Sequence, residues 1–363
     1  MALLQSLITV VVFVVMLGGL VLVHELGHFV TARLARVRVL EFGIGFPPRA
    51  KVLANRGETL YSLNWLPIGG FVKLEGEDGN DSGDPRSFQR APLITKLIIL
   101  LAGVLMNLLV AFVIFFLIAW LFTPNMGVRV GEVEADSPAQ AAGIRTGDEI
   151  LSVDGQEFEF FGTSILEGIR SNAGKTVTLV VRRDGQVQPV TVTLRQPAQV
   201  DRTHGTLGIR GSEGVHTGSY VTGRPVLAAA AIGVDQTQRA LSLILGGLAK
   251  LGQDIVANPT TAPSASGPIG IGVQTGNILW GLGPVFTLYF AGLLSANLAL
   301  VNFLPFPPLD GGRMLVIVLK ALVGNKLSVQ AERLTYLVGF ALLFAFLIWI
   351  TAFDIARLGG VVE

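Results

Sequence analysis

Two histidines and a glutamate stand at a spacing that suits metal binding, in the stretch VLVHELGHFV at residues 21–30. Positions i and i+4 of a helix share a face, so His24 and His28 can ligate one ion while Glu25 lies beside them. HExxH is the zinc-protease pattern: zinc polarises a carbonyl and acidifies its bound water, and the glutamate passes the water's proton to the leaving amine. The pattern predicts a hydrolytic zinc site. The alternative is an accidental match, with solvated side chains at a helix end.

The motif ends a run of uncharged residues, 3–23, in a chain of 363 residues that is 51% hydrophobic, 15% charged and has a mean hydropathy of +0.60. Such a composition predicts a membrane protein. Ionisable groups cost about 2.5 to 3.5 kcal/mol each in a bilayer, so a cluster of them there is usually functional. The net charge of +1 gives no sign of a nucleic-acid surface. Without cysteine, a transition metal must be held by His, Asp or Glu.

Four segments are apolar over the roughly 20 residues that a spanning helix needs: 3 to about 33, 97–122, 285–304 and 335–353. The first lacks a basic start and a cleavage site, so we expect a retained span and not a signal peptide. Residues 224–254 carry an apolar stripe with sparse charges, which predicts an amphipathic juxtamembrane helix and not a fifth span. Residues 258–283, rich in Pro, Ser and Gly, are expected to form a linker or a re-entrant segment.

The cations indicate the orientation. Six of them follow the first span: Arg33, Arg36, Arg38, Arg49, Lys51 and Arg56. The positive-inside rule places this loop in the cytoplasm, and Lys320, Lys326 and Arg333 mark the loop between spans three and four in the same way. Both termini and the long segment 123–283 are then extracytoplasmic, in a multi-pass membrane protein, for which the family resemblance given below implies the bacterial plasma membrane.

A catalytic zinc needs a third protein ligand. His204 and His216 qualify by residue type, but both lie in the outer segment, whereas the HExxH motif lies at the cytoplasmic end of span one. Asp310 follows the third span, which runs from outside to inside, and so emerges at the level of the two motif histidines. The alternative for Asp310 is a helix N-cap ahead of residues 311–320.

Residues 127–156, GVRVGEVEADSPAQAAGIRTGDEILSVDGQ, alternate short strands with a Ser-Pro-Ala helix start. A helix near residues 164–171 and a hairpin that turns at Asp184 and Gly185 are predicted to follow. This pattern resembles a bacterial PDZ domain, whose groove accepts a chain end or an extended peptide by strand addition. An unrelated small β-rich domain is the alternative. Whether such a domain would bind a ligand or only exclude large ectodomains stays open.

HELGH in the first span, LDGG after the third, four spans and a PDZ insert together resemble the site-2 protease family of intramembrane zinc metalloproteases, of the bacterial RseP type. The resemblance covers essentially the whole chain. It implies that one zinc ion per chain is held by His24, His28 and Asp310, with Glu25 as the general base. It also implies substrate-binding and helix-unwinding roles for four residues of the third-span motif: Asn297, Asn302, Pro305 and Pro307. The two prolines would break the span in any case.

The stretch ETLYSLNWLPIGGFVKLEG, residues 58–76, is predicted to form two short strands about residues 67–70, with an edge that could pair with an unwound substrate. Family members carry a membrane-associated β-hairpin with a similar Gly-Gly-aromatic-Val-Lys element, which implies substrate contacts for Gly69, Gly70 and Phe71. An ordinary cytoplasmic hairpin is the alternative.

The predicted fold class is a polytopic α-helical membrane protein with four transmembrane helices, a membrane-associated β-hairpin and an inserted extracytoplasmic α+β PDZ domain. The predicted domains are an N-terminal membrane region (1–122), the PDZ domain (123–200), a linker with the juxtamembrane helix (201–283) and a C-terminal membrane region (284–363).

The predicted function is zinc-dependent cleavage of transmembrane segments of single-pass proteins, after another protease has removed their outer domain. The resemblance implies anti-sigma factors as substrates, with remnant signal peptides as a second class. One rival is a catalytically silent membrane scaffold with a PDZ binding module and a structural zinc site. An ion transporter is weaker, because no inverted repeat is visible.

Overall fold

The computed structural model describes residues 2–77, 83–201, 204–257, 263, 265–323 and 329–360. The chain divides into two compact units. The membrane unit consists of Met1–Phe115 and Val234–Glu363, and the inserted unit of Phe116–Gly233. Lys326 and residues 258–262, which the sequence analysis placed in loops, lie outside the described residues.

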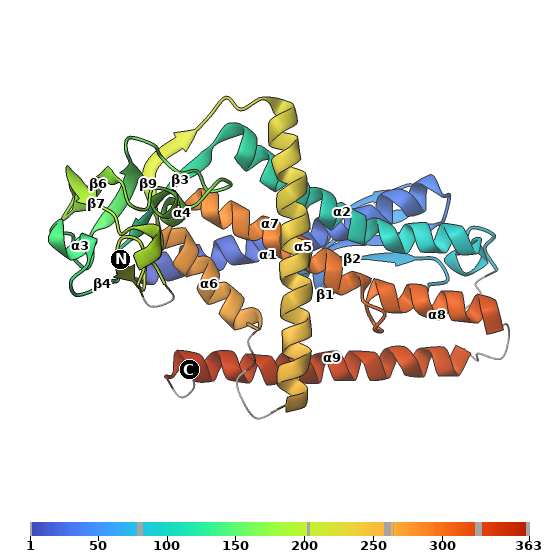
Figure 1. The fold of residues 1–363 in the computed structure, drawn as a ribbon. Coiled ribbons are helices and arrows are strands. Elements are labelled where there is room, and N and C mark those ends of the chain that lie inside the picture. Colours follow the sequence, from blue (N-terminus) through green and yellow to red (C-terminus); the bar gives the residue numbers. More distant parts are fainter. Residues whose placement is uncertain are drawn as a thin grey trace. The chain divides into compact units, whose positions relative to one another are not determined.

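Long helices dominate the membrane unit (Figure 1). They are α1 (Ala2–Leu34), α2 (Leu93–Leu121), α5 (Val226–Ala257), α6 (Pro268–Gly281), α7 (Pro284–Phe303), α8 (Asp310–Val323) and α9 (Val329–Leu358). In the described part of the chain, five of them are long and apolar enough to cross a membrane, namely α1, α2, α5, α7 and α9. Four correspond to the predicted spans, and the fifth is α5. The protein is thus a multi-pass membrane protein with several apolar helices and additional sheets.

Helix α1 continues past the HExxH motif, as the absence of a polar cap there predicts. It ends where Arg36 adopts a left-handed conformation, with φ of 59°. The N–H of Val37 then donates to the carbonyl of Ala32 at 2.9 Å, which satisfies one of the last helical carbonyls. The motif is therefore held inside a regular helix and not at a frayed end.

Strands β1 (Val39–Arg56) and β2 (Thr59–Leu74) follow α1 and pair antiparallel. Residues 41–44 of β1 pair on one side with residues 60–63 of β2 and on the other side with residues 70–73. Each strand therefore reverses direction, and the four segments lie side by side in one sheet with the second half of β2 at one edge.

The predicted reversal about residues 67–70 agrees with the pairing register: residues 60–63 run parallel to residues 41–44, whereas residues 70–73 run antiparallel to them. The chain also reverses at Gly57, whose φ of +64° suits a tight turn between β1 and β2, and β2 itself changes direction between residues 63 and 70. Gly69, with φ of +87°, accompanies an irregularity in the register.

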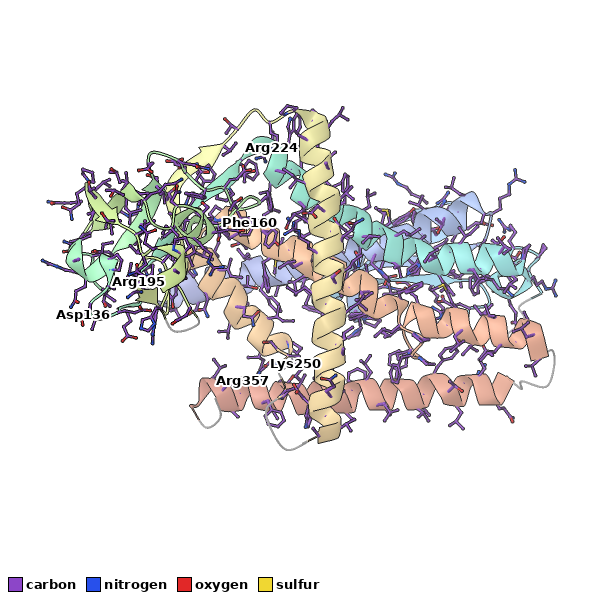
Figure 2. The ribbon with its side chains drawn as sticks, viewed as in Figure 1. Asp136, Phe160, Arg195, Arg224, Lys250 and Arg357 are labelled. Atoms are coloured by element: carbon purple, nitrogen blue, oxygen red, sulfur yellow. The ribbon has the colours of Figure 1, made fainter. Side chains whose placement is uncertain are left out.

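Of the two alternatives predicted for residues 258–283, the linker is wrong over residues 268–281, which form α6, and the re-entrant segment stays a prediction. Its N-cap residue, Gly267, offers no side chain, and Asp354 of α9 supplies the cap. The Asp354 carboxylate is buried and accepts the N–H groups of Gly267 at 3.1 Å and Gly270 at 2.8 Å. Arg357, labelled in Figure 2, donates to the carbonyls of Pro263 and Ala265. The entry to α6 is thereby fixed to α9.

The inserted unit contains a five-stranded antiparallel sheet in the order β7-β6-β5-β3-β9. Its strands are β3 (Thr123–Arg129), β5 (Glu149–Val153), β6 (Thr176–Arg183), β7 (Gln186–Thr193) and β9 (Glu213–Val221); β4 (Glu132–Val133) pairs with β8 (Ile209–Arg210). Short helices α3 (Pro138–Ala141) and α4 (Ile165–Ser171) accompany the sheet. The hairpin at Asp184 and Gly185 and both helices agree with the predictions.

Candidate metal centre

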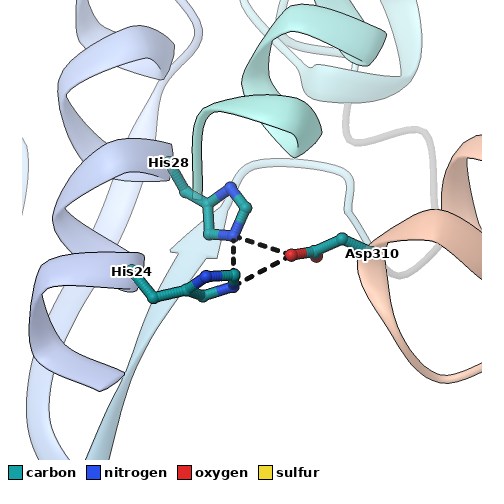
Figure 3. A group of neighbouring side chains, drawn as sticks. All are labelled: His24, His28 and Asp310. Carbon is teal, nitrogen blue, oxygen red and sulfur yellow. Dashed lines mark hydrogen bonds and ion pairs between the residues drawn. The ribbon is translucent and has the colours of Figure 1, made fainter. Parts of the chain in front are cut away.

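Three potential metal ligands from two helices meet in the membrane unit. His24 and His28 lie one turn apart on α1, and Asp310 is the first residue of α8. Figure 3 shows both imidazole rings turned toward the Asp310 carboxylate. The Oδ2 atom of Asp310 lies 2.9 Å from Nε2 of His24 and 3.2 Å from Nε2 of His28, and the two Nε2 atoms are 3.2 Å apart. All three residues are buried.

The geometry of these three atoms fits a zinc ion. Zinc bonds of about 2.0 to 2.1 Å in a tetrahedral arrangement place the ligand atoms about 3.3 Å apart, close to the separations observed here. Although Oδ2 of Asp310 lies near both rings, it is buried and accepts no hydrogen bond of acceptable geometry in the described part of the chain. Nitrogen lone pairs and an unsatisfied carboxylate oxygen that converge in this way suit a shared cation better than a hydrogen-bonded cluster.

The LDGG sequence explains how Asp310 reaches this position. A side chain on Gly311 would overlap the backbone carbonyl of Phe303, and one on Gly312 would overlap the backbone around Pro307. Both glycines therefore allow the start of α8 to pack against the chain that leaves α7. The Asp310 carboxylate is turned toward the imidazoles, and these contacts do not favour the predicted alternative of a helix N-cap.

Helix α2 closes the centre from behind, which the sequence analysis missed. Nδ1 of His28 lies 2.8 Å from the carbonyl oxygen of Ile99, so the neutral ring donates there and presents Nε2 to the centre. A side chain on Gly103 would overlap the ring of His28 and come within 2.8 Å of Cε1 of His24. The signals in the sequence are the small pair Ala102-Gly103 and the polar Asn107 within a largely apolar segment.

Glu25 lies beside the two histidines and is half-buried. Its Cγ is 3.6 Å from the position that a Cβ on Gly70 would occupy, so β2 passes directly against the glutamate. The other hairpin candidates face β1: Gly69 lies against the ring of Phe46, and the ring of Phe71 lies against Gly43. Of the three, Gly70 is the residue that the structure brings to the motif.

The third-span candidates lie before and within the turn that precedes Asp310. Asn297 and Asn302 are half-buried residues of α7, whereas Pro305 and Pro307 follow its end at Phe303. The expected helix break is thus present. The substrate roles of the four residues stay predictions.

His204 and His216 belong to the inserted unit and are not part of the three-residue centre. His204 lies 3.2 Å from the carboxylate of Asp201, and Nε2 of His216 lies 3.3 Å from the carbonyl oxygen of Ser219.

Comparison with known proteins decides the family. The model of peptidase family M50 matches residues 12–346. The chain belongs to this family. It is 31% identical over 355 residues to a putative zinc metalloprotease of Clostridium acetobutylicum, covering 97% of this chain and 98% of the relative. A putative zinc metalloprotease of Clostridium perfringens is 34% identical over 93% of this chain and 96% of its own length. The regulator of sigma-W protease RasP of Bacillus subtilis is 27% identical over 96% and 99%.

Membership in family M50 confirms the predicted relationship to the site-2 proteases and the predicted enzyme class, a metalloprotease with zinc as its cofactor. The donor set at the centre contains nitrogen and oxygen atoms only, which agrees with zinc.

Proposed function

We propose that this metalloprotease is an intramembrane endopeptidase that hydrolyses peptide bonds within the transmembrane segments of single-pass membrane proteins. The observation that carries the proposal is the buried convergence of His24, His28 and Asp310 inside a long apolar helix bundle, with Glu25 on the same helical turn. A protease that acted on soluble chains would have no need to place its ligands within such a segment.

His24, His28 and Asp310 would hold the zinc ion, and an open fourth position would accept water or substrate. When bound, zinc polarises the scissile carbonyl and lowers the pKa of its water. Glu25 would take the proton from that water as the oxygen attacks the carbonyl carbon. It would then deliver the proton to the amide nitrogen as the C–N bond breaks, which leaves a carboxylate and an amine.

The order of the helices supports four spans. Helices α1 and α7 both reach the centre toward their C-terminal ends, so they cross in the same direction, opposite to α2. The chain between α2 and α7 must then cross the membrane an even number of times or not at all. With 14 residues, α6 is about 21 Å long and falls short of the hydrocarbon core of about 30 Å. If α6 does not span the membrane, an even number of crossings requires that α5 does not span it. In Figure 1, residues 234–257 of α5 also run across the direction of α1, α2 and α9.

The cations that follow α1 support a cytoplasmic location for the loop that contains β1 and β2, with both termini and the inserted unit outside. We assign the inserted unit to the PDZ class because it combines a small antiparallel sheet, two short helices and the Ser-Pro-Ala helix start, whose Ser137 caps α3. Deleting residues 127–195 tests its role. Premature cleavage of unprocessed substrates would support a steric filter, and loss of all cleavage would support recruitment.

The substrate would be a helix that has been locally unwound, since a peptide bond inside a helix is shielded. Residues 70–73 of β2 pair with β1 along one edge, and no described strand pairs with their other edge. Because Gly70 lies against Glu25, an extended segment added at that edge would run past the base. Asn302 would hold the unwound backbone. The name of the Bacillus subtilis relative supports anti-sigma factors as one substrate class.

Strand addition can be tested without changing the enzyme around its base. In a peptide substrate, each backbone amide near the cleaved bond is replaced in turn by an ester, which removes one N–H donor. Replacements should slow cleavage at alternate positions, because a strand presents every second N–H to its neighbour. Uniform effects would exclude the edge of β2 as the binding site. A Gly70→Pro variant should also lose most of its cleavage activity while its zinc content stays unchanged.

The proteolytic proposal is tested by reconstituting the full chain with a single-pass model substrate and comparing it with Glu25→Gln. We expect cleavage within the transmembrane segment by the wild type, and a variant that keeps zinc but loses cleavage at least about 100-fold, as expected for removal of a general base. If several substrates stay intact while both proteins hold zinc, the silent-scaffold alternative is favoured.

A further inference from the structure

The amide side chain of Asn107 on α2 lies beside the first proposed zinc ligand. Asn107 is fully buried, and its Nδ2 atom is 3.4 Å from Nδ1 of His24. Its Oδ1 atom is also buried and has no hydrogen-bond partner among the described residues. A buried amide that leaves its acceptor unused is uncommon in folded proteins, and it requires an explanation.

The unused acceptor and the nearby ring nitrogen can form one hydrogen bond if the amide is turned. The Nε2 atom of His24 faces Asp310, and a neutral imidazole that ligates a metal through Nε2 carries its proton on Nδ1. That N–H needs an acceptor, yet it faces the amino group of Asn107. Turning the amide by half a turn exchanges Oδ1 with Nδ2 at almost the same shape. The Nδ1 proton of His24 is then donated to Oδ1 of Asn107.

Helix α2 also provides a hydrogen-bond acceptor for the second histidine, His28. His28 uses its Nδ1 atom toward the carbonyl of Ile99, and the segment around Gly103 passes close against both rings. Ile99, Gly103 and Asn107 recur every fourth residue and so share one face of α2. This face supplies one acceptor, one close approach and a second acceptor, in the order in which the two rings require them.

Helix α7 fixes the position of Asn107 from the other side. The hydroxyl of Ser295, which is buried, donates to the backbone carbonyl of Asn107 at 2.7 Å. The contact holds the backbone of α2 at this turn without using the amide side chain. The amide is therefore available for His24.

We propose that Asn107 is a positioning residue for the metal centre: its amide oxygen accepts the Nδ1 proton of His24, fixes the ring tautomer and aims Nε2 at the zinc ion. The inference rests on the proposed ligand set of His24, His28 and Asp310. Loss of such an outer partner typically weakens metal binding about 10- to 100-fold.

Zinc affinity of the metal-free full-length protein in detergent micelles, measured by competition with a chromophoric chelator, tests the inference. Asn107→Leu keeps the approximate size but removes the acceptor, and we expect zinc binding to weaken about 10- to 100-fold. Asn107→Asp keeps an acceptor and should bind zinc at least as tightly as the wild type. If the amide instead donated to His24, the aspartate would weaken binding as well.

Ser295→Ala is the matched control, because it loosens the same contact between α2 and α7 without changing the amide. It should leave zinc affinity unchanged, and an effect equal to that of Asn107→Leu would overturn the inference in favour of helix packing. Unchanged affinity in Asn107→Leu would also overturn it. His24→Ala and Asp310→Ala separate the two proposals: if they too retain full affinity, the ligand set itself is wrong.

Nitrogen-15 NMR of histidine-labelled, zinc-loaded wild type gives a reading that does not depend on any variant at position 107. We expect His24 to show a protonated Nδ1 and a metal-bound Nε2. A metal-bound Nδ1 would contradict the inference even if every Asn107 variant failed to fold.

Discussion

Asp148 of the inserted unit and Asp310 of the membrane unit are both buried carboxylates, 2% and 9% exposed, but their oxygens find different partners. Arg183 donates to both oxygens of Asp148 at 2.7 and 2.6 Å, and the backbone N–H of Arg145 donates at 2.8 Å. Asp310 instead faces two imidazoles, and its Oδ2 accepts no hydrogen bond of acceptable geometry from the described residues. A buried carboxylate whose oxygens all accept hydrogen bonds from the protein has a structural role. A buried carboxylate with an unused oxygen beside two imidazole nitrogens is suited to bind a cation.

The largest difference is expected when the carboxylate is removed from the metal centre. Asp310→Ala deletes one of three proposed ligands, so zinc affinity should fall by more than the roughly 100-fold that loss of an outer partner can cause, and cleavage should be lost with it. Zinc content after dialysis and cleavage of a model substrate measure both effects. A variant that retains zinc would show that Asp310 is not a ligand.

The matching change in the inserted unit should affect stability and leave zinc unchanged. Asp148→Ala removes a buried carboxylate that accepts hydrogen bonds from Arg183 and from the Arg145 backbone, which should cost about 1 to 3 kcal/mol of unfolding free energy. Hydrogen exchange of the β5 and β6 amides in the full chain measures the loss. A drop in zinc content in this variant would contradict the view that Asp148 is structural and that only Asp310 serves the metal centre.

A smaller loss of zinc affinity is expected when α2, which packs against the two histidine rings, is changed. A Cβ on Gly103 would overlap the imidazole of His28, so Gly103→Ala should displace the rings and weaken zinc binding about 10- to 100-fold. Gly19, around which a Cβ would meet nothing within 4 Å, provides the control, because Gly19→Ala should bind zinc normally. Equal affinities in both variants would mean that α2 does not form the back of the centre.

The smallest effect is a pH dependence of the inserted unit. Burial raises the pKa of Asp148, but the hydrogen bonds from Arg183 and from the Arg145 backbone outweigh it and hold the pKa below its ordinary value. Since the folded pKa is lowered, this stabilisation is complete above the unfolded value of about 3.9 and is lost as the pH falls through the folded value. Protection of β5 should therefore stay constant from about pH 7 to 5 and decline below about pH 4. Asp148→Ala should flatten that decline, and an unchanged decline would assign it to other groups.

Local patterns in the sequence predict much of the centre. The HExxH spacing places His24, Glu25 and His28 on one helix, and the direction of the third span brings Asp310 to the same level. The hairpin at Asp184 and Gly185 is likewise local, since the turn residues and the alternating strands adjoin each other.

The errors arise where distant residues decide the structure. Residues 268–281 form a helix although they are rich in glycine, because Asp354 caps the helix from 87 positions further along the chain. No short-range pattern indicates that Ile99, Gly103 and Asn107 lie behind the two histidines, since that depends on which helix packs against α1.

X-ray absorption at the zinc edge of the purified wild-type chain tests the central claim most directly. The geometry of His24, His28 and Asp310 predicts one zinc ion per chain with two imidazole nitrogens and a carboxylate oxygen at about 2.0 to 2.2 Å, completed by a light solvent atom. The chain has four histidines. A shell with three or more imidazoles would require His204 or His216 and would contradict the account.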